Sequence, residues 1–194
     1  MKSTDMALIL LAAGRSRRFG YADKLMADLG GRPLGLHVAQ CVSEMRWRQK
    51  LAVVASDGLR DGLMALGFET VTPASDAGIG DNLALAARQV NSATGVLVCL
   101  ADMPFVPLTH IKALLSALGD GITIAVSAAG DAKVPPVAFS ATHIATLRGL
   151  SGDQGARRIL ISAAVQTVIL DAAADELFDI DTVVDMKRAR ERFR

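Results

Sequence analysis

Residues 7–20 read Ala-Leu-Ile-Leu-Leu-Ala-Ala-Gly-Arg-Ser-Arg-Arg-Phe-Gly, an apolar run that ends in a glycine and a cluster of arginines. An unbroken apolar run of this length, bounded by a turn, is typical of a strand buried on both faces of a parallel sheet. In proteins built on such sheets, ligands bind beyond the carboxyl ends of the strands. The stretch therefore predicts a buried strand at residues 7–13 that leads into a ligand-binding loop.

The rest of the chain alternates apolar runs with segments of helical periodicity, which is the pattern of an α/β sheet with crossover helices. Further strands are predicted at residues 50–55, 68–72, 96–101, 122–127, 137–140 and 166–170, with an antiparallel orientation left open for 137–140. Helices are predicted at residues 33–45, 57–67, 82–90, 109–118, 156–162 and 182–193. Pro33 is expected to open the first helix, and Asp57 to cap the second.

Length and composition limit the class of protein. The 194 residues, 51% of them apolar, suffice for one sizeable core, so we expect a single domain over residues 1–194. The longest apolar run, residues 6–13, is far shorter than the roughly 20 residues of a membrane-spanning helix, and no secretion signal precedes it. A net charge of +1 and few aromatic residues argue against nucleic-acid binding. These features predict a cytoplasmic protein that binds neither membrane nor nucleic acid.

The cysteines and histidines show no pattern of catalytic or metal chemistry. Cys41 and Cys99 lie in a helix pattern and a strand pattern without metal or disulfide spacing, so we expect two buried thiols. His37, His110 and His143 are far apart and have neither metal spacing nor a nucleophile partner. We interpret all three as structural.

The loop after the first strand has the composition of an anion site. Gly14 and Gly20 permit unusual backbone angles, which lets exposed amide groups surround an anion. Positive charge is available from Arg15, Arg18 and Lys24. The glycine spacing differs from that of a Walker A loop, and a serine replaces the second glycine of the dinucleotide fingerprint. The alternative is a basic surface loop that serves only solubility.

A second group of residues follows the strand predicted at 96–101. The strand ends in Asp102-Met103-Pro104, and the proline cannot continue a ladder of hydrogen bonds. If this strand is parallel to the first, the Asp102 carboxylate lies at the same rim as the arginine-rich loop. It could hold Mg²⁺ against phosphate oxygens, which Mg²⁺ prefers to a site made of protein alone. The alternative is a turn or helix-capping aspartate.

The pattern Leu-Ala-Ala-Gly-x-Ser-x-Arg-x-Gly at residues 11–20, with Lys24 after it, resembles the signature of the nucleoside triphosphate transferases, and especially the molybdenum cofactor cytidylyltransferase group. The resemblance implies a three-layer, Rossmann-like α/β fold of the nucleotide-diphospho-sugar transferase (GT-A-like) type, with a mostly parallel sheet and helices on both faces. It implies nucleotide-binding roles for Leu11, Ala12, Ala13, Gly14, Ser16 and Arg18. It implies catalytic roles for Arg15, Lys24 and Asp102.

Further segments extend the resemblance to residue 186. Asp102-Met-Pro is similar to the family's metal-binding strand end, and Asp181 is the implied second metal ligand, with Asp179 as the alternative. Gly78 and Asn82 occupy a stretch that contributes to the family's nucleotide pocket, where Asn82 replaces a serine. Residues 150–157 resemble an element that lies near the acceptor, whereas Asp153 taken alone is expected to cap the following helix. Residues 130–137 depart from the family pattern, which leaves the acceptor open.

The resemblance implies a nucleotidyltransferase that uses Mg²⁺ and a nucleoside triphosphate, CTP in the leading interpretation, with molybdopterin as the phosphorylated acceptor. A transferase for GTP or another triphosphate with a different phosphorylated acceptor is the first alternative. A nucleotide-binding module without turnover is the second. A molybdoenzyme or its chaperone is the protein partner that the resemblance suggests.

Overall fold

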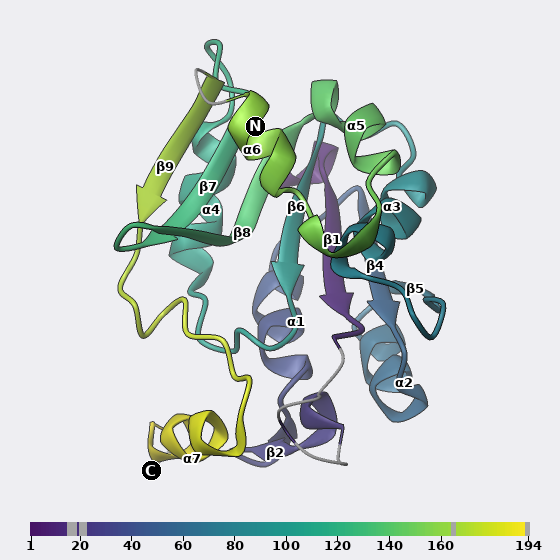
Figure 1. Ribbon diagram of the computed structural model, residues 1–194, viewed down its shortest axis with the longest axis vertical. Coiled ribbons are helices and arrows are strands. Elements are labelled where there is room, and N and C mark those ends of the chain that lie inside the picture. Colours follow the sequence, from purple (N-terminus) through teal and green to yellow (C-terminus); the bar gives the residue numbers. More distant parts are fainter. Residues whose placement is uncertain (15–18, 20–22, 164–165, 193–194) are drawn as a thin grey trace.

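The fold is organised around β1 (Ala7–Ala12), an interior strand of a seven-stranded sheet (Figure 1). The computed structural model describes residues 1–14, 19, 23–163 and 166–192. Its strand order is β5-β4-β1-β6-β8-β7-β9. The remaining strands of the sheet are β4 (Gln49–Val54), β5 (Glu69–Val71), β6 (Gly95–Leu100), β7 (Ile124–Ala129), β8 (Ala132–Ser140) and β9 (Thr167–Asp171).

The apolar run of β1 is buried on both faces, as its sequence predicts. Leu8 and Leu10 belong to one hydrophobic core, and Ala7 and Ile9 belong to the other. Side chains alternate between the faces of a strand, so a strand covered on both faces needs apolar residues at every position. The neighbouring strands β4 and β6 both run parallel to β1.

Helices cover both faces of the sheet (Figure 1). The first core contains residues of α1, α2, α4 and α7, and the second contains residues of α3, α5 and α6. The bounds of the helices are α1 (Leu36–Ser43), α2 (Asp57–Ala65), α3 (Ile79–Gln89), α4 (Leu108–Ala117), α5 (Ile144–Arg148), α6 (Arg157–Ser162) and α7 (Val183–Glu191). The predicted three-layer, mostly parallel α/β fold is confirmed. In the described part of the chain, no helix is long and apolar enough to cross a membrane.

β8 runs antiparallel to its neighbours β6 and β7, which decides the orientation that the sequence left open. It is also longer than the predicted strand at 137–140, because it begins at Ala132. The pairing with β7 passes from Val137 directly to Val134 and leaves out Pro135 and Pro136. Proline has no N–H for a ladder, so a strand can contain two prolines only where its pairing is interrupted.

The predicted helix at residues 33–45 is wrong at its beginning. Pro33 lies in β3 (Arg32–Pro33), which pairs antiparallel with β2 (Asp28–Leu29). Gly30 and Gly31 both have positive φ angles, 62° and 83°. A two-residue hairpin turn with positive φ at both positions favours Gly-Gly, a signal that the helical reading of Pro33 overlooked.

Other boundaries differ from the sequence expectation in smaller ways. Asp57 is the first helical residue of α2, whereas the cap position belongs to Ser56. α7 begins after Thr182, whose hydroxyl accepts a hydrogen bond from the N–H of Asp185 at 3.1 Å. Cys99 is buried as expected, but Cys41 is only half-buried.

A buried hydrogen-bonded chain supports the structural interpretation of His110. The Ser127 hydroxyl donates to the carbonyl oxygen of Pro136 at 2.7 Å, and His110 Nε2 lies 2.8 Å from Ser127 Oγ. Because the hydroxyl has a single proton and donates it to Pro136, Nε2 carries the proton of the hydrogen bond between His110 and Ser127. Burial lowers the pKa of His110, and the charge of Glu176 raises it by less, so its pKa lies below the usual value.

The turn η4 (Gly152–Gln154) packs against the beginning of α3. A Cβ atom on Gly80 would lie 2.8 Å from the carbonyl oxygens of Ser151 and Gly152. A Cβ atom on Gly78 would lie 2.5 Å from the carbonyl oxygen of Gly152 and from Oδ1 of Asp153. The two glycines therefore permit a backbone approach that no other residue type would allow.

We expect the free energy of unfolding to decrease between pH 7.5 and pH 5.5, and His110 to be one cause. A folded-state pKa below the unfolded value of about 6.5 means that the unfolded chain takes up the proton first. The stabilising contribution is complete above that pH and is lost as the pH falls toward the folded-state pKa, by up to about 1.4 kcal/mol per pH unit. Urea unfolding of the wild type and of His110→Gln at several pH values measures this contribution of His110 to the free energy of unfolding. An equally steep pH dependence in the variant would contradict this role.

We expect Gly80→Ala to destabilise the protein by about 1–3 kcal/mol, because the new methyl group meets backbone atoms that cannot move independently. Gly58→Ala in α2 is the matched control. A Cβ atom there meets only the flexible end of Met26, at 3.0 Å from Cε. The control should be neutral or stabilising by up to about 1 kcal/mol, the helix-propensity gain of alanine. Equal unfolding free energies for the two variants in urea titrations would show that the close approach to η4 is not required.

Candidate active site

The loops that follow β1 and β6 meet at one edge of the sheet, because these strands are parallel neighbours. Leu11 of β1 pairs with Leu100 of β6, and the Ala101 N–H donates to the carbonyl oxygen of Leu11 at 3.0 Å. Asp102 and Gly14, which follow these two strands, therefore lie at the same rim of the sheet. This is the location where ligands bind in open α/β sheets.

A short 3₁₀ turn, η2 (Lys24–Met26), places the Lys24 side chain at this rim. The side chain of Asp23 accepts a hydrogen bond from the N–H of Leu25 at 3.0 Å and so caps the turn. Lys24 is only 4% exposed. A lysine is almost never buried to this extent unless its charge is paired.

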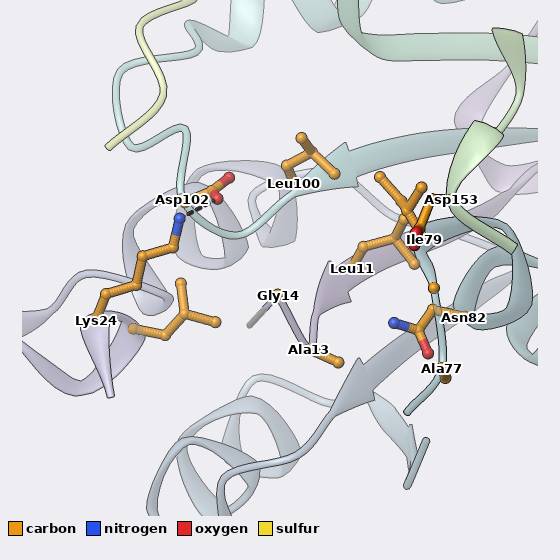
Figure 2. A pocket seen from close by; sticks show the side chains of 12 residues that line it. Leu11, Ala13, Gly14, Lys24, Ala77, Ile79, Asn82, Leu100, Asp102 and Asp153 are labelled. Atoms are coloured by element: carbon orange, nitrogen blue, oxygen red, sulfur yellow. Dashed lines mark hydrogen bonds and ion pairs between the residues drawn. The ribbon is translucent and has the colours of Figure 1, made fainter. Parts of the chain in front are cut away.

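Three acceptors surround the Lys24 ammonium group. Nζ donates to Asp102 Oδ2 at 2.7 Å, to Asp181 Oδ1 at 3.0 Å and to the carbonyl oxygen of Ile180 at 2.9 Å. Figure 2 shows Lys24 and Asp102 facing each other at one side of a cavity. The N–H of Ile180 also donates to the carbonyl oxygen of Asp102 at 3.0 Å. The structure thus brings together three segments that are far apart in the sequence.

The two carboxylates keep Lys24 charged. Burial by itself lowers the pKa of Lys24, but the charge and hydrogen bond of Asp102, followed by those of Asp181, outweigh burial and raise the pKa above its usual value. Asp179 is exposed, and its pKa is raised first by partial loss of solvation and then by the charges of Asp181 and Asp102. The carboxylates therefore outnumber the ammonium group at this rim.

The carboxylates also suit a divalent cation. Asp102 Oδ1 is buried and has no hydrogen-bond partner among the described residues. Asp102 and Asp181 lie close together, since both contact Lys24 Nζ, at 2.7 Å and 3.0 Å. Mg²⁺ is usually bound by one or two carboxylates together with substrate phosphates and water. The donor set therefore fits Mg²⁺ shared with a phosphorylated ligand.

A cavity of about 330 Å³ lies beside the ion pairs of Lys24 (Figure 2). The residues singled out from the sequence that line it are Leu11, Ala13, Gly14, Lys24, Gly78, Asn82 and Asp102. The other lining residues are Leu25, Ala77, Ile79, Leu100 and Asp153. A Cβ atom on Gly14 would meet no described atom within 4 Å.

The remaining residues from the sequence analysis do not line the cavity or cannot be placed. Ala12 is 2% exposed and belongs to the core on the α1 side of the sheet. Asp181 contacts Lys24 without being part of the lining. Arg15, Ser16 and Arg18 lie outside the described residues.

Asn82 lies across the cavity from the Lys24–Asp102 ion pair (Figure 2). It is 6% exposed, and its Oδ1 has no hydrogen-bond partner in the described part of the chain. A buried carboxamide oxygen without a partner costs free energy, typically about 1–3 kcal/mol. Such a group at a cavity wall is suited to accept a hydrogen bond from a ligand.

Asp153 is a lining residue that sequence reasoning missed. Standing alone, it suggested a cap for the following helix, but the cap position of α6 belongs to Ala156, without a side-chain hydrogen bond. Asp153 instead lies in η4, next to the glycines that begin α3. The pair Gly78 and Gly80 was the available signal, since it indicates that another segment of backbone approaches closely.

A second cavity, of about 570 Å³, adjoins η4. It is lined by Thr146, Gly149, Leu150, Ser151, Gly152, Asp153, Gly155, Ile159 and Ser162. Asp153 is shared with the first cavity. Asp153 therefore borders two neighbouring cavities, the first of which is also lined by Lys24 and Asp102.

Residues 8–168 match the family model described as the MobA-like NTP transferase domain. The purine catabolism protein PucB of Bacillus subtilis is 30% identical over 196 residues, which cover 94% of each chain. A molybdenum cofactor guanylyltransferase of Shewanella putrefaciens is 24% identical and covers 87% of this chain and 86% of its own.

A solved structure from Mycobacterium tuberculosis, determined in complex with manganese, has the same fold. Its TM-score is 0.78, its sequence identity 23%, and the match covers 97% of this chain and 99% of that one. The family match covers most of the strands and helices that form the rim. The expected membership in the nucleoside triphosphate transferases is confirmed: the chain belongs to the MobA-like NTP transferase family and is a nucleotidyltransferase.

Proposed function

We propose that this protein is a Mg²⁺-dependent cytidylyltransferase that transfers CMP from CTP to the phosphate of molybdopterin and releases pyrophosphate. The observation that carries the proposal is the convergence of Lys24, Asp102 and Asp181 beside the 330 Å³ cavity. Transfer of a nucleotidyl group requires positive charge on the triphosphate and, in most cases, a carboxylate-bound metal. Residues 1–194 would act as one domain.

The proposed reaction is an in-line attack by an acceptor phosphate oxygen on the α-phosphorus of CTP. The new P–O bond replaces the bond to pyrophosphate, which leaves with the electron pair. An ionised phosphate needs no general base, which agrees with histidines that serve other contacts. Lys24 would stabilise the charge that develops on the leaving group. Asp102 and Asp181 would hold Mg²⁺, which supplies further positive charge to the phosphate oxygens.

The nucleotide would lie along the cavity. Its triphosphate would be at the Lys24 end, where Gly14 lines the cavity and where the family resemblance assigns Arg15, Ser16 and Arg18. Its nucleoside would then reach Gly78 and Asn82 at the other end. Asn82 Oδ1, which has no partner among the residues that the structure describes, would accept a hydrogen bond from the ribose or the base.

We favour CTP over GTP because of one residue in the wall of the first cavity, Ala13. Ala13 lines the cavity at a position where the guanylyltransferase branch tends to have glycine, and its methyl group reduces the room for a purine. GTP is the second candidate, because one similar relative is named a molybdenum cofactor guanylyltransferase. Thermal-shift measurements with CTP, GTP, UTP and ATP, each with Mg²⁺, separate the candidates, since the preferred nucleotide stabilises the folded protein most.

The acceptor would occupy the second cavity, which borders the first at Asp153. Its volume of about 570 Å³ is sufficient for a ligand the size of a pterin. The segment 133–136, which departs from the family pattern, forms the irregular part of β8, and Pro135 lies in the wall of a smaller apolar cavity that shares Leu11 and Leu100 with the first. A molybdoenzyme or its chaperone would receive the product.

We expect Lys24→Ala and Asp102→Ala each to reduce the rate of pyrophosphate release by roughly a hundredfold, or about 3 kcal/mol of barrier. Each variant removes a charge that the proposed transition state requires. The measurement is a coupled pyrophosphate assay with purified molybdopterin at saturating CTP and Mg²⁺.

Asp120→Asn is the control, because Asp120 is exposed in the turn between α4 and β7. It should retain wild-type activity, and thermal unfolding should show that all variants are folded. Full activity of either alanine variant would refute the role of that residue. Nucleotide binding without pyrophosphate release by the wild type would favour a binding module over an enzyme.

We expect Asn82→Leu to stabilise the protein in the absence of nucleotide by about 1 kcal/mol while reducing the thermal shift produced by CTP. Leucine is close to asparagine in size and removes the buried oxygen that has no partner among the described residues. The same oxygen would be lost as an acceptor for the nucleotide. A comparison of unfolding in urea with nucleotide thermal shifts measures both effects. An undiminished CTP shift would place the nucleoside elsewhere.

A further inference from the structure

The Lys24 ammonium group and a divalent cation would use the same two carboxylates. Nζ lies 2.7 Å from Asp102 Oδ2 and 3.0 Å from Asp181 Oδ1. These are distances of direct hydrogen-bonded ion pairs. A cation placed on both carboxylates would stand next to this ammonium group, and the two positive charges would repel each other in a partly buried site.

The Lys24 side chain borders both the carboxylates and the cavity. Lys24 also lines the 330 Å³ cavity, so its flexible stem already lies at the boundary between the carboxylates and the space proposed for the triphosphate. The backbone contact from the Ile180 N–H to the carbonyl oxygen of Asp102 does not involve Lys24. This contact would hold the two aspartate-bearing segments together after the ammonium group has moved.

We propose that Lys24 competes with the catalytic divalent cation for Asp102 and Asp181, and that the nucleotide relieves this competition by drawing the ammonium group onto its phosphates. The inference rests on the proposed function, since it takes these carboxylates as the metal ligands. Its consequence is that the cation binds strongly only together with the triphosphate. Binding of metal and nucleotide is then reciprocal: each tightens the other by the same factor.

Lys24 would therefore have two opposite effects that can be measured separately. It supports turnover, because its charge stabilises the leaving group. It weakens the binding of metal alone, because its charge occupies the carboxylates. A lysine that only contacts phosphate would have the first effect without the second.

The test is a titration of the purified protein with Mn²⁺, with free Mn²⁺ measured by electron paramagnetic resonance. It is done with and without a non-hydrolysable CTP analogue. Lys24→Met removes the charge and keeps an unbranched stem, and Lys24→Arg keeps the charge. Lys112→Met, on the exposed side of α4, is the control for the loss of a positive charge elsewhere. Asp102→Asn tests whether Mn²⁺ binds at the carboxylates at all.

We expect Lys24→Met to bind Mn²⁺ without nucleotide on the order of tenfold more tightly than the wild type, within the range of about 5- to 150-fold typical of coupled sites. The gain of affinity on adding the analogue should shrink by the same factor. Lys24→Arg and Lys112→Met should remain close to the wild type. Thermal unfolding checks that Lys24→Met is folded.

Unchanged or weaker Mn²⁺ binding by folded Lys24→Met, with binding abolished in Asp102→Asn, would overturn the competition and leave the proposed metal site intact. Mn²⁺ binding that Asp102→Asn does not affect would instead overturn the metal site and with it the proposed function. If Lys24→Met does not fold, the Mn²⁺ titration of the wild type still tests the inference. An Mn²⁺ affinity of the wild type that the CTP analogue does not increase would contradict it.

Discussion

The candidate site depends on one buried ammonium group. Lys24 Nζ donates to Asp102, Ile180 and Asp181, which lie 78, 156 and 157 residues further along the chain. A buried lysine is costly unless its charge is compensated, and a buried carboxylate has the same requirement. Lys24 supplies the positive charge for the two carboxylates, and the segments of Asp102 and Asp181 supply the acceptors for Lys24. The positions of the three segments at the rim therefore depend on one another.

The sheet makes this meeting possible. β1 and β6 are parallel neighbours with apolar residues on both faces, so the loops at their carboxyl ends leave from adjacent points. α7 follows Asp181 and is anchored to the rest of the rim, since the guanidinium group of Arg190 donates to the carbonyl oxygen of Asp28 in β2 at 2.8 and 3.0 Å. Strands and helices therefore lie around the ion pairs of Lys24, and the first cavity lies beside these ion pairs.

Much of this arrangement is predictable from local patterns. The apolar runs predict the central strands, and the residues directly after them, Gly14 and Asp102, are found at the rim because strand ends determine where loops begin. The sequence-based prediction is wrong where the same residue type is favoured in two different local structures. Pro33 is favoured both in a first helical turn and beside a tight hairpin, and Asp153 suits both a cap and a cavity wall. Pro135 and Pro136 interrupt the apolar pattern of β8, so the predicted strand begins after them, although β8 itself begins at Ala132.

The sequence by itself determined the class of the fold and the chemical groups available at its loops, because burial on both faces and turn formation depend on residues that are close in the chain. Only the tertiary structure decided how these groups are combined. The contact of Lys24 with the two proposed metal carboxylates and the backbone approach at Gly80 both involve segments distant in sequence. Distances of this kind follow from packing, which no local pattern specifies.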